Sequence, residues 1–121
     1  MPRLSGSAKT KRDNQQVYLY VWDYFNHRIV KRLKSNLSFV AKIGSLGAGD
    51  DQFNYPYGGC VDDVYIYVGD TGNNRIVKRL KSNLSFVAKI GSLGAGDDQF
   101  YYPSGVGVFK PTRFMQNLRK W

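Results

Sequence analysis

The sequence contains one block of 26 residues twice, without a single substitution. Residues 28–53 and 75–100 both read RIVKRLKSNLSFVAKIGSLGAGDDQF, and the two blocks begin 47 residues apart. The similarity continues upstream, where VYLYVWD at residues 17–23 aligns with VYIYVGD at residues 64–70. A period of this length is typical of repeat proteins, in which each unit buries its hydrophobic face against the next. We therefore expect two units with the same local structure.

Each full unit reads as four short β-strands separated by turns. Residues 64–68 are a continuous β-branched and aromatic run, which is typical of a strand covered on both faces. Residues 86–90 alternate with a period of two and predict a half-buried strand, while residues 75–80 alternate less regularly. Two glycines share one face at residues 105–108, which predicts a strand where another backbone comes close. Turns are expected at residues 70–74, 81–83 and 93–98.

A basic amphipathic helix is the alternative for part of each unit. Ile29, Leu33 and Leu37 recur at helical spacing with lysine and arginine between them. Ser35 and Asn36 fall in the middle of this stretch, where such side chains compete for backbone hydrogen bonds. The β-branched runs on both sides also favour strands, so the sequence indicates an all-β chain.

Three motifs follow one another in a fixed order in the second unit. Residues 56–58 read PYG, residues 67–76 read YVGDTGNNRI, and residues 91–100 read GSLGAGDDQF; the first unit carries NHRI at residues 26–29. In this order they resemble the NHL-repeat family of β-propellers, whose repeats run from Pro-x-Gly through Asn-His-Arg-Ile to a glycine-rich loop and Gln-Phe. The resemblance covers about residues 17–109. It implies an all-β fold of antiparallel four-stranded blades of an NHL-type β-propeller, about two blades per chain.

The first unit departs from this pattern at its start. Residues 9–11 read KTK where the second unit has PYG, so we expect the first unit to lack its first strand. We expect residues 103–109 to form a lone first strand after the second unit. The expected order is therefore three strands, then four, then one. Since the family usually closes with about six blades, the resemblance implies either a homo-oligomer, a trimer completing six blades, or a fragment of a longer protein.

The positive charge of the chain is concentrated at its two ends. The formal net charge is +9, but residues 1–14 contribute +3 and residues 110–121 contribute +4, which leaves +2 on residues 15–109. We expect a basic N-terminal tail, an NHL-repeat segment with units at about 15–57 and 58–109, and a basic C-terminal tail. The nearly neutral body weakens a nucleic-acid interpretation.

The same sequence indicates a cytoplasmic chain without disulfides. No run approaches the roughly eighteen apolar residues of a membrane span, and the N-terminal residues do not read as a secretory signal. Cys60 is the only cysteine. The sequences Asn36-Leu37-Ser38 and Asn83-Leu84-Ser85 are glycosylation acceptors that would matter only in a secreted chain.

The sequence offers no convincing catalytic or metal-binding group. His27 is the only histidine, and the second unit has an asparagine at the equivalent position. The paired aspartates match no metal loop and are typical of turns. We therefore expect no enzyme activity, no cofactor and no metal. The resemblance implies that acid–arginine pairs and turn residues form a structural motif, comprising Asp23, His27, Arg28, Asp70, Asn74 and Arg75.

The interpretation that fits these features best is a non-catalytic binding or scaffold module that presents its blade loops to a protein partner. Aromatic side chains dominate many binding surfaces. The candidate contacts are Trp22, Tyr24, Phe25, Tyr55, Tyr57, Tyr101 and Tyr102. Two alternatives are an RNA-binding propeller, with bases stacked on aromatic rings, and a symmetric propeller assembly that binds sugar (glycan) ligands.

Overall fold

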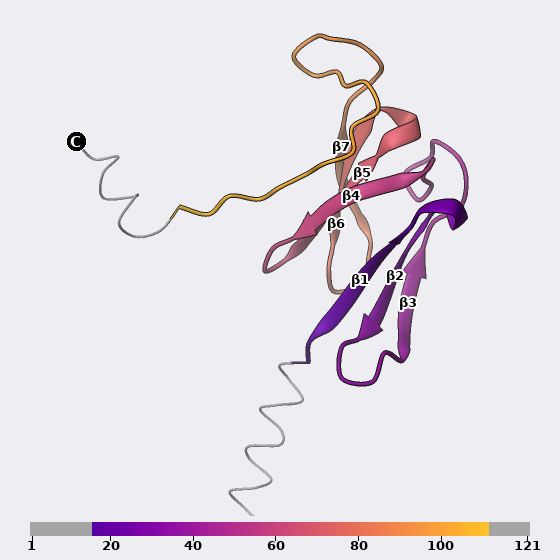
Figure 1. The fold of residues 1–121 in the computed structure, drawn as a ribbon, viewed down its shortest axis with the longest axis vertical. Coiled ribbons are helices and arrows are strands. Elements are labelled where there is room, and N and C mark those ends of the chain that lie inside the picture. Colours follow the sequence, from indigo (N-terminus) through magenta and orange to yellow (C-terminus); the bar gives the residue numbers. More distant parts are fainter. Residues whose placement is uncertain (1–15, 112–121) are drawn as a thin grey trace, which may run out of the picture.

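A computed structural model describes residues 16–111 as two antiparallel β-sheets joined by loops (Figure 1). The first sheet has the order β1-β2-β3 and the second has the order β4-β5-β6-β7. The strands are β1 (Tyr18–Asp23), β2 (Arg28–Leu33), β3 (Phe39–Ile43), β4 (Pro56–Val61), β5 (Tyr65–Asp70), β6 (Arg75–Leu80) and β7 (Phe86–Ile90). The only helices in this part of the chain are two 3₁₀ turns, η1 (Tyr24–Asn26) and η2 (Thr71–Asn73). The all-β antiparallel class is confirmed.

The helical alternative is wrong, because Ile29 and Leu33 lie in β2 and Leu37 lies in the turn between β2 and β3. Among residues 16–111, no helix is long and apolar enough to cross a membrane.

The two units fold alike, as their shared sequence requires. β1 pairs with β2 from Tyr18↔Leu33 to Asp23↔Arg28, and β5 pairs with β6 in the equivalent register. The next pairing, β2 with β3 or β6 with β7, shifts register at the same place in each unit, between Lys31 and Arg32 in the first and between the equivalent residues of the second. Local sequence therefore determines strand positions and register in both copies.

The order of three strands followed by four is confirmed, but the expected eighth strand is absent from the described residues. Residues 103–111 form no strand and leave the second sheet as a plain trace (Figure 1). The prediction that another backbone lies close to these glycines is also wrong, since a Cβ added at Gly105 or Gly107 would meet no atom within 4 Å. A strand needs a neighbouring edge to satisfy its backbone groups, and no strand of residues 16–111 pairs with this segment.

Burial corrects two expectations about individual strands. In β5, Ile66 and Val68 are fully buried while Tyr65 and Tyr67, on the other face, are only partly buried, so this strand is not covered equally on both faces. In β7 only Phe86 is partly buried, and Ile90 is exposed. The reason is that β7 lies at the edge of its sheet and no further sheet packs on it within the described chain.

The hydrophobic core lies between the two sheets. Its fully or nearly fully buried side chains come from β2, the loop before β4, β5, β6 and the turn after β6: Ile29, Phe53, Ile66, Val68, Val77 and Leu84. Burying a side chain of this size contributes about 1.5 to 3 kcal/mol. The sheets are therefore held together mainly by this shared layer, which also fixes the loops at their ends.

Candidate functional site

An aspartate at the end of β1 and another at the end of β5 organise the turns that follow. Asp23 Oδ2 accepts hydrogen bonds from Arg28 Nε at 2.7 Å and from Asn26 Nδ2 at 3.0 Å. These bonds, first that of Asn26 and then that of Arg28, lower the pKa of Asp23. In the second unit Arg75 Nε lies 2.7 Å from Asp70 Oδ2. Each pair holds a 3₁₀ turn at the end of a strand and so presents residues 24–25 or 71–72 to the surface.

The residue that closes each turn adopts a left-handed backbone conformation. His27 has a φ of 53° and Asn74 a φ of 55°. His27 Nδ1 accepts a hydrogen bond from the Tyr55 N–H at 2.9 Å, and Asn74 Oδ1 accepts the equivalent bond from the Tyr102 N–H at 2.9 Å. An imidazole and an amide thus perform the same backbone-anchoring role, and both position a tyrosine beside the turn.

Five of the seven candidate contacts lie together, and we call them the aromatic surface: Trp22, Tyr24, Phe25, Tyr55 and Tyr57. The Tyr24 ring is central, with its centroid 5.0 Å from that of Phe25, 4.9 Å from Tyr55 and 5.8 Å from Tyr57. The arrangement is largely edge-to-face, which aromatic quadrupoles favour. Phe25 is 79% exposed. A large apolar area therefore faces solvent at the loop end of the two sheets.

A cavity of about 420 Å³ opens within this surface and is lined by Trp22, Tyr24, Tyr57 and Thr71. The Trp22 indole packs over β4 at Gly59, where an added Cβ would collide with the ring. Its Nε1 is buried and has no hydrogen-bond partner in the described segment. The cavity joins the two units, since Thr71 belongs to the second and the tryptophan to the first.

The aromatic surface occurs in one unit only. At the positions of Trp22, Tyr24, Phe25 and Tyr57 the second unit carries, in order, Gly69, Thr71, Gly72 and Ser104. Tyr101 and Tyr102 form a separate pair with ring centroids 4.7 Å apart, and no ring contact within residues 16–111 joins them to the aromatic surface. The units thus share the identical blocks 28–53 and 75–100 but differ in the side chains presented at this end.

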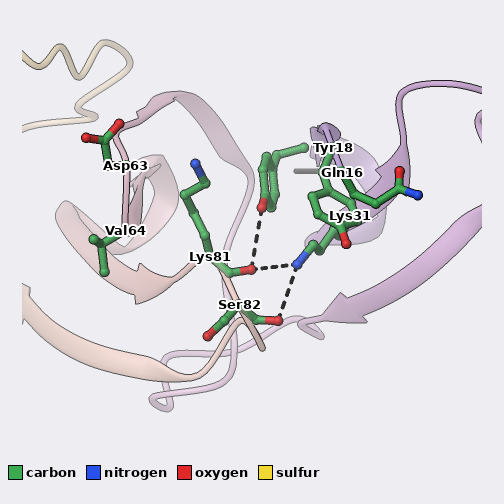
Figure 2. A pocket seen from close by; sticks show the side chains of 8 residues that line it. Gln16, Tyr18, Lys31, Asp63, Val64, Lys81 and Ser82 are labelled. Carbon is green, nitrogen blue, oxygen red and sulfur yellow. Dashed lines mark hydrogen bonds between the residues drawn. The ribbon is translucent and has the colours of Figure 1, made fainter. Parts of the chain in front are cut away.

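A second cavity, of about 320 Å³, lies between the sheets around Lys31 (Figure 2). The Lys31 Nζ donates to the carbonyl oxygens of Lys81 at 2.8 Å and Ser82 at 3.3 Å, and the Tyr20 hydroxyl donates to the same Lys81 oxygen at 3.4 Å. Burial, and then the charge of Lys81, lower the pKa of Lys31. Because its ammonium is engaged by backbone carbonyls, Lys31 links the sheets. Sequence reasoning missed Lys31. The feature that could have indicated it is that the strand paired with β2 carries tyrosines on the face of this lysine.

Two arginines of β6 grip the glycine-rich loop that precedes β4, and sequence reasoning missed this arrangement too. Arg75 donates from Nη1 to the Ala48 carbonyl at 3.0 Å and from Nη2 to the carbonyls of Gly49 and Gln52, both at 2.9 Å. This network ties the loop of the first unit to the second sheet. The signal was present in the alternation of arginines on one face of β6.

The second arginine, Arg79, is fully buried. It donates from Nε to the Leu84 carbonyl at 2.6 Å, from Nη1 to the Asp50 carbonyl at 2.7 Å and from Nη2 to Asp51 Oδ1 at 2.7 Å. Charge-assisted bonds of this kind are among the stronger ones in proteins. The buried face of β6 therefore holds the loop through arginine hydrogen bonds and also contributes to the hydrophobic core.

Asp62, in the turn between β4 and β5, has three structural partners. Asp62 accepts hydrogen bonds from the Tyr65 and Val64 amides and the Tyr67 hydroxyl, and these bonds, that of Tyr65 first, lower its pKa. Burial, and then the charge of Asp62, raise the pKa of the Cys60 thiol and so disfavour its reactive thiolate form. Within residues 16–111, no group of three or more histidine, cysteine, aspartate or glutamate side chains is arranged to hold a metal ion.

Comparison with known proteins adds no assignment, because neither a family model nor a curated protein matches the chain. The fold and the site themselves define an all-β protein of two repeated units with an exposed aromatic surface at one end.

Proposed function

We propose that the chain is a non-catalytic binding module of NHL-repeat type whose two sheets are neighbouring propeller blades, and that its aromatic surface contacts a protein partner. The observation that supports this most directly is the clustering of exposed rings around Tyr24. Exposed apolar patches rimmed by polar groups mark interaction sites, and tyrosine and tryptophan are enriched among residues that dominate binding energy.

The shape of the surface supports a partner that inserts an apolar side chain. The cavity beside Tyr24 is walled by aromatic rings and a threonine. Residues 15–109 carry a net charge of only +2, so electrostatic attraction to phosphate backbones contributes little here. The restriction of these aromatic residues to one unit leaves a single such surface on residues 16–111, which suits one specific contact rather than a repeated ligand pocket.

The second unit provides substitutions with which to test this function. Changing Tyr24→Thr together with Tyr57→Ser gives the first unit the residues that the second unit already accommodates at these positions. The matched control is Tyr101→Asn, which copies the first unit and alters an aromatic residue outside the aromatic surface.

The experiment is selection of binders from a displayed peptide library on the full chain, followed by calorimetric titration of the selected peptides. We expect the double variant to bind at least about tenfold more weakly, a loss of about 1.4 kcal/mol, and Tyr101→Asn to bind as the parent does. The proposal fails if no peptide is enriched, or if binding is insensitive to the double change. It also fails if single-stranded RNA or a glycan, rather than peptide, binds through these rings.

A further inference from the structure

The contact between the two units is built from residues that occur a second time in the chain. The loop at residues 44–53 docks on Arg75 and Arg79 of β6. Because residues 28–53 and 75–100 are identical, the loop at residues 91–100 is a second copy of the docked loop. By the same identity, the arginines of β2 are second copies of the receiving arginines. Within residues 16–111, one loop and one arginine pair therefore contact each other, while their second copies do not.

Differences in burial between identical residues locate the unused surfaces. The Arg75 side chain is 6% exposed and that of Arg28, its equivalent, is 35% exposed. Leu84 is 2% exposed, whereas its equivalent Leu37 is 56% exposed. Since the local sequences are the same, the difference comes from a covering neighbour, which the second sheet has and the first lacks among the described residues. The face of the first sheet that carries Arg28 is thus uncovered within residues 16–111 and is available for docking of such a loop.

Within residues 16–111, a segment that pairs with no strand matches a sheet edge that is unpaired. Residues 103–108 align with β4, which pairs with β5 from Pro56↔Asp70 to Val61↔Ile66. The equivalent strand of the first sheet is β1, whose outer edge is unpaired within residues 16–111. Adding residues 103–108 to that edge in the same register would place Pro103 opposite Asp23 and give the first sheet its fourth strand. Such strand addition satisfies backbone groups on both sides.

Side-chain volume supports the same register for this segment. In the structure, the Trp22 indole fills the space above Gly59. One repeat further on, the large and small residues are exchanged: Gly69 replaces the tryptophan and Val106 replaces the glycine. A strand at residues 103–108 would therefore place a valine beside a glycine where β4 places a glycine beside a tryptophan. The combined side-chain volume at the contact is therefore partly conserved, although the larger side chain now comes from the other strand.

We propose that the chain binds a second copy of itself head to tail. The tail is the loop at residues 91–100 with the strand segment 103–108, and the head is the first sheet with Arg28, Arg32 and the edge of β1. Arg28 of one copy would donate to the carbonyls of residues 95, 96 and 99 of the next. Arg32 would donate to the residue 97 carbonyl and to the Asp98 carboxylate. Such a heterologous interface closes into a ring or continues as a filament.

The polarity of this interface can be tested with two variants of the full chain. Leu37→Asp places a charge on the head, and Asp98→Lys reverses a charge on the tail; both side chains are exposed, so the fold tolerates the changes. The matched control is Leu46→Asp. Leu46 and its equivalent Leu93 are 61% and 60% exposed, so this position lies outside the contact in both units.

The readout is absolute molar mass by light scattering after size exclusion, over a range of concentrations. We expect the parent and Leu46→Asp to exceed the 13.8 kDa of one chain, and each of the other variants alone to have that single-chain mass. Mixing Leu37→Asp with Asp98→Lys leaves one intact head and one intact tail, and should restore a 1:1 pair of twice the mass. A parent chain that stays monomeric at every concentration overturns the proposal, as does a mixture that does not pair.

Discussion

Arg75 and Arg28 occupy the same position in identical sequence, so one substitution made at both isolates the effect of tertiary surroundings. Replacing Arg75 by methionine leaves the fully buried Asp70 carboxylate without its guanidinium. Two hydrogen bonds to that carboxylate remain, from Asn73 Nδ2 at 2.9 Å and the Asn54 N–H at 2.8 Å. Removing one partner of a buried ion pair costs about 3 to 5 kcal/mol.

The matched change Arg28→Met should be nearly neutral. Its ion pair with Asp23 is partly exposed, with 35% of the arginine side chain and 27% of the aspartate side chain accessible. Exposed pairs contribute about 0 to 1 kcal/mol. The two variants should therefore differ by about 3 kcal/mol, which is a factor of more than about 100 in the unfolding equilibrium constant.

The assay is urea unfolding followed by circular dichroism, at a concentration where the chain is monomeric. Because a small domain has about 5 to 15 kcal/mol of stability, Arg75→Met could leave too little folded protein to measure. Arg75→Lys retains a positive charge beside Asp70 but loses the forked contacts to the loop carbonyls, and should cost about 1 to 2 kcal/mol. Equal losses of unfolding free energy in Arg75→Met and Arg28→Met would refute the conclusion that Arg75 holds the loop.

Three further predictions concern the turns and the titratable groups. Asn74→His should change the free energy of unfolding by less than about 0.5 kcal/mol, because His27 makes the same hydrogen bond in the first unit. Asn74→Ala should lower it by about 1 to 2 kcal/mol. Chemical denaturation distinguishes the two variants, and a large loss with histidine would contradict the shared role. Hydrogen bonds from the backbone amides of Tyr65 and then Val64 lower the pKa of Asp62 from 3.8. The resulting stabilisation of the fold is complete above pH 3.8 and is lost as the pH falls through the lower pKa of the folded state. The stability difference between the parent and Asp62→Asn should therefore shrink below pH 3.8, and a constant difference in acid titrations would oppose this. Cys60, whose pKa is raised by burial, should react with a disulfide reagent at pH 8 several-fold more slowly in the folded chain than in urea, and equal rates would show that the thiol is unprotected.

Much of the local structure follows from the sequence alone. The runs of β-branched and aromatic residues and the Asp-to-Arg turns specify seven strands in the predicted order, because strand propensity, turn chemistry and hairpin register depend on neighbours close in sequence. The duplication also predicts correctly that both units repeat one register. Proximity of the aromatic residues does not follow from the sequence, since Tyr24 lies in η1 and Tyr57 in β4 and only folding brings them together.

Burial was decided by tertiary structure. Leu37 and Leu84 lie in identical sequence, yet one is exposed and the other is in the core. The same contrast separates Arg28 from Arg75, and it explains why residues 103–108 form no strand although β4, their counterpart, does. Sequence specifies what a segment can pair with, but exposure and pairing depend on which surface packs against it. In this chain that surface is present beside the second unit and lacking, among the described residues, beside the first.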